Sequence, residues 1–139
     1  MRVVIDANVF ISGLLSKKGP PGQILDAWSE GQFSLIVSFQ IVTEIKRALE
    51  YPRIQERLEP RQANQLIEML FTATEWVEGN LDLNVLTLDP ADNMYLSCAV
   101  ESHADFLITG NLKHYSEAGN PFKEVVILTP RKFLEVLKR

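Results

Sequence analysis

The order of hydrophobic and polar positions along the chain predicts strands and helices in alternation. Val3, Val4 and Ile5 form a run of branched aliphatic residues, which is typical of a strand buried on both faces of a parallel sheet. Similar runs predict further strands at 33–37, 76–78, 105–109 and 125–128. Amphipathic spacing predicts helices at about 8–15, 21–30, 39–49, 60–73, 89–103 and from 130 onward. This alternation predicts an α/β fold with three α/β/α layers around a central, mainly parallel twisted sheet.

Two stretches have no clear helical or strand pattern. We interpret 79–88 as an extended connection and 110–123 as a loop with Asn120-Pro121 as a turn. The first stretch matters because strand carboxyl ends and the helix amino ends that follow them share one edge of a parallel sheet. The helix that opens near Asp92 reaches this edge only if the connection returns the chain across the sheet.

An acid ends the first predicted strand. Asp6 lies where open α/β sheets bind their ligands, and a buried carboxylate costs several kcal/mol unless it is hydrated, paired or bound to a metal. Asp6 could instead serve only as the N-cap of the next helix, whose apolar residues begin directly after Asn8. The residues alone leave both interpretations open.

Two further acids lie near predicted helix starts. Asp92 is on the same side of its helix as Leu96 and Ala99, which is the side predicted to face the core. A capping role does not require that direction, and Asp89 is the better candidate for a structural cap. Glu44 lies at the margin of the apolar stripe of the preceding helix, where Ser38 occupies the expected N-cap position.

Length and composition limit the number of domains and the cellular compartment that we expect. Its 139 residues predict a single domain, 1–139, that can form a core without disulfides, and we interpret the one cysteine, Cys98, as a packing residue. The N-terminus enters a strand without signal-peptide regions, and no apolar run reaches the roughly 18 residues that a transmembrane helix requires. We therefore expect a soluble, cytoplasmic protein with no membrane partner.

The net charge of -4 would seem to argue against a nucleic-acid partner. If Asp6, Glu44 and Asp92 share one metal site, the rest of the chain is nearly neutral. Net charge then says little about the partner.

Four motifs, in order, resemble those of the PIN domain family over essentially the whole chain. A strand ending in Asp-x-Asn is matched by residues 4–8, and a Ser that opens a helix carrying a Glu is matched by Ser38 and Glu44. An Asp that opens a helix with an Ala seven positions later is matched by 92–99, and a strand ending in Thr-x-Asp or Thr-x-Asn by 109–111. Each motif is weak alone, but the four together at these intervals are specific.

The resemblance is strongest to one branch of the family. Segments 89–93 and 109–114 are similar to the bacterial and archaeal members described as toxins of toxin-antitoxin pairs. It implies a metal-dependent endoribonuclease that hydrolyses phosphodiester bonds of single-stranded RNA and is held in check by a small antitoxin protein.

The resemblance also implies a set of site residues. Three carboxylates, Asp6, Glu44 and Asp92, would be both catalytic residues and ligands of Mg²⁺ or Mn²⁺, hard cations that prefer oxygen. Substrate contacts or support would come from Asn8, Ser38, Thr109, Asn111 and His114. The chain departs from the wider family at Asn111, where an acid is common, and this departure leaves open whether the site is fully active.

Two other classes of protein compete with this interpretation. A phosphoacceptor receiver domain also places acids at the top of a parallel sheet, but it has an acidic pair after the first strand and a Lys before Pro after the last. Here Ala7-Asn8 follows Asp6, and Thr129 precedes Pro130. The other alternative is a catalytically weak PIN domain that only binds RNA or a protein, which the Asn at position 111 leaves open.

We also expect a homodimer. The helix at 60–73 carries a wide apolar band that includes Leu66, Ile67, Leu70 and Phe71. A two-fold contact through this helix would bury the part of the band that its own sheet does not cover. It could also place a basic stripe along an RNA path, formed by Arg53, Arg57 and Arg61. The alternative is a monomer in which the same band packs wholly on its own sheet.

Overall fold

The computed structural model describes residues 1–86, 88–118 and 124–139, and at its centre is a parallel sheet. Its strands are β1 (Arg2–Ile5), β2 (Ser34–Val37), β3 (Glu75–Trp76), β4 (Phe106–Ile108) and β5 (Val126–Leu128), in the order β3-β2-β1-β4-β5. All four pairings are parallel. The branched residues of the first strand are almost fully buried, which explains why β1 lies at the centre of the sheet.

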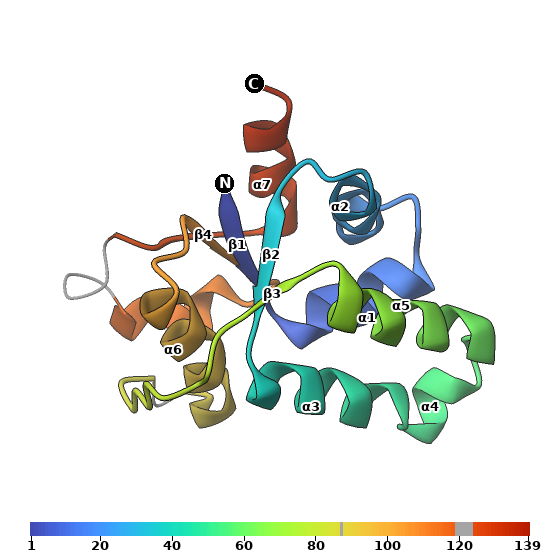
Figure 1. Ribbon diagram of the computed structural model, residues 1–139, viewed down its shortest axis with the longest axis horizontal. Helices are drawn as coiled ribbons and strands as arrows, with labels where there is room; N and C mark the ends of the chain where they lie inside the picture. Colours follow the sequence, from blue (N-terminus) through green and yellow to red (C-terminus); the bar gives the residue numbers. More distant parts are fainter. Residues whose placement is uncertain (87, 119–123) are drawn as a thin grey trace.

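Helices cover both faces of this sheet (Figure 1). The helices are α1 (Ala7–Leu15), α2 (Pro20–Ser29), α3 (Phe39–Leu49), α4 (Pro52–Gln55), α5 (Pro60–Thr72), α6 (Asn93–Glu101) and α7 (Pro130–Leu137). There are also two short 3₁₀ segments. The first, η1 (Pro90–Asp92), directly precedes α6, and the second, η2 (Leu112–Ala118), follows β4. Helix α6 lies on one side of the strands, and α1, α2 and α5 lie on the other (Figure 1).

The predicted three-layer α/β fold is confirmed, with differences at particular segments. The short helix α4 was not predicted, and residues 112–118 of the predicted loop form η2. The helix predicted to reach His103 ends at Glu101, because His103 takes a positive φ of 55° that turns the chain toward β4. The predicted Asn120-Pro121 turn lies outside the described residues.

The connection between β3 and α6 returns the chain along α6 as an extended segment. Backbone N–H groups of alternate residues, 79, 81, 83 and 85, face this helix and donate to side chains on it. The acceptors are Glu101, Ser97 and Asn93, spaced by four along α6. Four helical residues rise about 6 Å and two extended residues about 6.7 Å, so the two repeats match. The segment thereby carries the chain back to the edge where β1 and β4 end.

Asn93 makes the largest number of these contacts. Its Oδ1 accepts from Val85 N at 3.1 Å and Leu86 N at 2.9 Å, and its Nδ2 donates to Leu86 O at 3.0 Å and Pro90 O at 2.9 Å. All four hydrogen-bonding positions of the amide are therefore used. This residue ties the end of the connection to the start of α6.

The predicted apolar band of α5 is divided between buried and exposed residues. Leu66 and Leu70 are 4% and 0% exposed, so part of the band packs on the core. Phe71 is 55% exposed and stacks on Trp76, with ring centroids 5.3 Å apart.

Among the described residues, no helix has the length and apolar character to cross a membrane.

We predict that Asn93→Ala lowers the free energy of unfolding by about 3 kcal/mol. The substitution leaves backbone N–H and C=O groups near Leu86 buried without hydrogen-bond partners. Urea unfolding would measure the loss, and amide hydrogen exchange should accelerate at Val85 and Leu86. Asn80→Ala is the matched control, because its exposed amide contacts only Glu78 and should cost less than about 0.5 kcal/mol. Equal losses in the two variants would contradict the role given to Asn93.

Candidate metal centre

Asp6 is held at the end of β1 by groups from two segments. Its Oδ1 accepts from Asn8 N at 3.0 Å, so it does cap α1, and its Oδ2 accepts from Thr109 Oγ1 at 3.1 Å. Thr109 follows β4, the neighbour of β1, and its own hydroxyl accepts from Asn111 N at 3.0 Å. Capping and a place at the sheet edge are thus properties of the same carboxylate, which is only 2% exposed.

A second group of ligand atoms forms where η1 meets η2. His114 Nδ1 lies 2.9 Å from Asp92 Oδ2 and 3.8 Å from Asp89 Oδ2. One ligand atom from each of Asp89, Asp92 and His114 lies within 4.8 Å of the others, the spacing needed to hold one cation. Asp89 also caps η1 by accepting from Ala91 N at 3.2 Å, so the predicted cap is confirmed while its second oxygen faces His114.

The pKa values of the two buried acids, Asp6 and Asp92, show that burial makes their charged forms less favourable. Burial raises the pKa of Asp6, although the hydrogen bonds from Asn8 and Thr109 oppose the shift. Burial also raises the pKa of Asp92 to about 6, against the hydrogen bond to His114, and the charges of Asp6 and Asp89 add to the rise. Burial therefore destabilises the charged form of Asp92 relative to an exposed carboxylate, and a nearby cation would favour it.

Glu44 lies apart from the group formed by Asp89, Asp92 and His114. Its side chain is 29% exposed on α3 and pairs with Arg47 Nη1 at 3.2 Å, one helical turn away. It is nevertheless near the same centre, because the charges of Asp6, Glu44 and Asp92 all contribute to a raised pKa of Tyr95, after burial. The charges of all three predicted carboxylates thus act on one buried phenol.

Tyr115 adds a buried hydroxyl beside the acids. The residue is 3% exposed, and its hydroxyl has no hydrogen-bond partner among the described residues. Its pKa is raised by burial first, and then by the charges of Asp6 and Asp92. A buried hydroxyl without a partner costs about 1 to 3 kcal/mol, and a hydrated cation would supply a partner.

The remaining predicted residues have various roles. Asn8 contributes its backbone to Asp6, and the side chain of Asn111 is exposed near the same edge. Ser38 is 3% exposed and caps α3 by accepting from Ile41 N at 3.3 Å. Neither Tyr95 nor Tyr115 was predicted to be part of the site. Tyr95 could have been noticed one turn after Asp92, whereas no sequence signal marks Tyr115.

These residues fit a hydrated divalent cation. Buried carboxylates with raised pKa values, and a buried hydroxyl without a partner, are all relieved when a positive charge with bound water is nearby. His114 can orient the Asp92 carboxylate as an outer hydrogen-bond partner, an arrangement common around metal ligands. The cluster of Asp89, Asp92 and His114 could therefore bind a metal.

We predict that Asp92→Asn stabilises the metal-free protein by about 2 kcal/mol at pH 7.5 and has little effect near pH 4. The folded-state pKa of about 6 lies above the unfolded value, so the wild type is stabilised by protonation at low pH and loses this stability as pH rises through 6. Urea unfolding in EDTA across this range would measure it, with exposed Asp26→Asn on α2 as the matched charge change. A gain that is independent of pH, or no gain, would contradict the prediction.

Comparison with known proteins agrees with this geometry. A family model described as "PIN domain" matches residues 2–113. An uncharacterized protein of Methanocaldococcus jannaschii is 30% identical over 150 residues, covering 100% of this chain and 93% of its own length.

Two solved structures share the fold. One chain of VapBC2 from Rickettsia felis, bound to a DNA fragment from their promoter, matches with a TM-score of 0.58 and 13% identity, covering 93% of this chain and 98% of its own. One chain of FitAB bound to the IR36 DNA fragment matches with a TM-score of 0.52 and 16% identity, covering 92% of this chain and 94% of its own. The extent of the family match, on a fold with acids gathered at one sheet edge, places this protein in the PIN domain family.

Proposed function

We propose that this protein is a metal-dependent endoribonuclease that hydrolyses phosphodiester bonds in single-stranded RNA, with Asp6, Glu44 and Asp92 as ligands of Mg²⁺ or Mn²⁺. One observation carries the proposal. Asp6 and Asp92 are 2% and 7% exposed at the same sheet edge, where burial raises both of their pKa values. A site that holds unfavourable negative charge in this way favours a cation and a phosphate bound through it.

The chemistry divides between the ion and the chain. A bound Mg²⁺ or Mn²⁺ would activate a water for in-line attack on phosphorus and neutralise charge on the phosphate oxygens. Thr109 and the backbone of Asn8 hold the Asp6 carboxylate in place, and His114 holds that of Asp92. Asn111, exposed beside Thr109, is placed to contact substrate, where it offers an amide instead of a fourth negative charge.

We further propose that the protein acts as the toxin of a toxin-antitoxin pair. The resemblance of 89–93 and 109–114 to that branch of the family supports this role. The solved structures with the same fold, VapBC2 and FitAB, are both complexes with DNA fragments, and VapBC2 binds a fragment of its own promoter. By analogy, the antitoxin would be a small protein that covers the acids and connects the pair to DNA.

A second candidate function is a PIN domain that binds RNA or a protein without turnover. Asn111 favours it, because an amide removes one charge from the set that a second metal ion would require. Metal-dependent turnover on RNA separates the two functions.

We propose a homodimer through α5, because Phe71 is 55% exposed and forms an apolar patch with the stacked Trp76. We predict that the wild type sediments as a dimer at tens of micromolar and that Phe71→Glu is monomeric with its fold retained, since the charge would have to be buried in the contact. Glu68→Gln, a solvent-exposed change on the same helix, should leave the dimer intact. A monomeric wild type, or a dimeric Phe71→Glu, would show that α5 is not the interface.

We predict that Asp6→Asn and Asp92→Asn each reduce RNA cleavage more than about 100-fold while circular dichroism shows a folded protein. A pool of RNAs incubated with Mg²⁺, Mn²⁺ or EDTA would report the activity, and Asp26→Asn controls for the loss of one charge. Folded variants that cleave at the wild-type rate would contradict the assigned ligands. A wild type that binds RNA but never cleaves it would favour the second candidate function.

A further inference from the structure

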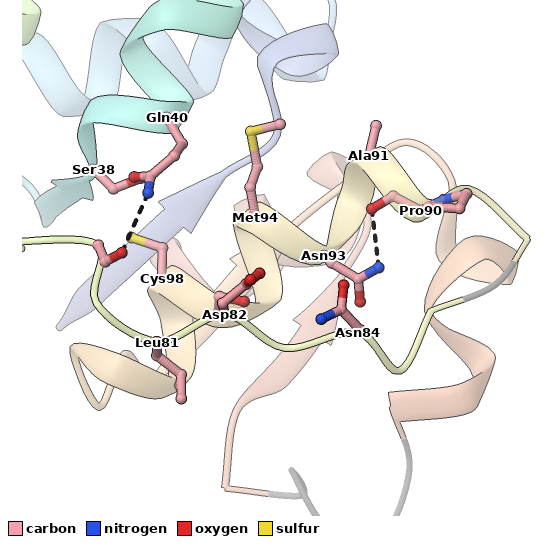
Figure 2. Close-up of a pocket in the computed structure, with 12 residues that line it drawn as sticks. Ser38, Gln40, Leu81, Asp82, Asn84, Pro90, Ala91, Asn93, Met94 and Cys98 are labelled. Atoms are coloured by element: carbon pink, nitrogen blue, oxygen red, sulfur yellow. Dashed lines mark hydrogen bonds between the residues drawn. The ribbon is translucent and has the colours of Figure 1, made fainter.

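A polar cleft lies between the start of α6 and the segment that runs along it. It has a volume of about 390 Å³ and is bounded by the start of α3, by α6 and by the extended connection at 79–86. At one end it reaches Pro90 and Ala91, the two residues between Asp89 and Asp92. Figure 2 shows Gln40 reaching toward the cleft from α3, with Asp82 and Asn84 reaching toward α6 from the connection. The cleft therefore adjoins the η1 segment, which carries Asp92 and is capped by Asp89.

The walls of this cleft are fixed before any ligand binds. The connection is held along α6 by the hydrogen bonds to Glu101, Ser97 and Asn93. Gly79 has a φ of +77°, and the Gln40 amide packs where a Cβ would lie, with Nε2 donating to Gly79 O at 3.2 Å (Figure 2). A ligand that enters this cleft does not have to order its walls.

The cleft presents one carboxylate and two amides. Gln40 donates one N–H to Gly79 O, and the exposed side chains of Asp82 and Asn84 bond to none of the described residues. No Lys or Arg is among the described residues that line it, and Asp82 is its only charged one. Such a cleft disfavours a phosphate and favours a neutral group that carries N–H donors. Met94 and Pro90 add apolar surface for a flat ring.

We propose that this cleft binds one unpaired guanine of the RNA, next to the phosphate that is cleaved. The inference rests on the proposed ribonuclease function. Guanine presents two adjacent donors, N1–H and the N2 amino group, on the edge that single-stranded RNA leaves free, and a carboxylate accepts such a pair through both oxygens. Adenine and cytosine each place an acceptor beside their amino group, and uracil has one N–H between two acceptors. Asp82 would therefore select guanine, and the amides of Gln40 and Asn84 would bind its remaining edge.

The test combines cleavage with binding, so that the two proposals can fail separately. Wild type and Asp82→Asn are compared on single-stranded oligonucleotides of otherwise uniform uridine that carry one guanine, one inosine, which lacks the N2 amino group, or one adenine. Binding is measured in EDTA by fluorescence anisotropy, and cleavage sites are mapped with Mn²⁺. Asp26→Asn on α2 is the matched control, because it makes the same charge change on another helix.

We expect the wild type to bind the guanine oligonucleotide about tenfold more tightly than the inosine or adenine ones and to cut within a nucleotide or two of the guanine. Asp82→Asn should lose this preference, and Asp26→Asn should keep it. Cleavage without guanine preference, or a preference that survives Asp82→Asn, would overturn the guanine site and leave the ribonuclease function standing. Guanine-selective binding that depends on Asp82 but comes without cleavage would support the site and count against the ribonuclease function. A wild type that binds no RNA would overturn both.

Discussion

The cost of burying carboxylates at the edge of a parallel sheet is the constraint on which this structure depends. Asp6 receives hydrogen bonds from Asn8 and Thr109, and Asp92 from His114, yet burial still raises the pKa of both acids. A fold selected for stability alone would place neutral or apolar groups here, because a buried charge is rarely favourable without a partner of opposite sign. A nearby cation would offset this cost, which is why the arrangement supports the proposed metal site.

The convergence of these acids depends on a segment with almost no regular secondary structure. Asp6 comes directly from the central strand, but Asp92 reaches it only because residues 79–86 return along α6. The near match between two extended residues and four helical residues lets one face of a helix satisfy alternate backbone N–H groups. The same segment forms one wall of the polar cleft, so the place of Asp92 and the shape of its neighbouring pocket have a single structural origin.

Much of this fold could be predicted from local patterns. Some structures can be predicted from residues that are adjacent in sequence. Examples are the strand at Val3 to Ile5, the helix cap at Ser38 and the helix start at Asp89-Pro90. Residues 79–88 were predicted as an extended connection, but nothing in that stretch indicated the helix on which it lies. That partner depends on tertiary contacts of Asn93, Ser97 and Glu101, which no local pattern contains.

The site could be predicted in part, for the same physical reason. Asp6 and Asp92 follow from their positions at element ends, but the approach of His114 to Asp92 and Asp89 depends on η2, a short 3₁₀ segment that was predicted as loop. Glu44 pairs with Arg47 on α3, and its role as a metal ligand stays a prediction. Tyr115 lies beside the acids only through packing, and a tyrosine with a buried, unpartnered hydroxyl has no signature in sequence.

We propose that a divalent cation binds among these acids. Titration of isotopically labelled protein with Mn²⁺, followed by amide NMR spectra, tests it directly, because the ion broadens signals of nearby nuclei whatever the activity. We expect signals at 6–8, 89–92 and 109–111 to broaden first, at well below stoichiometric Mn²⁺, and Asp6→Asn to weaken the effect. Broadening that begins elsewhere, or that is unchanged by Asp6→Asn, would contradict a metal centre at this edge of the sheet.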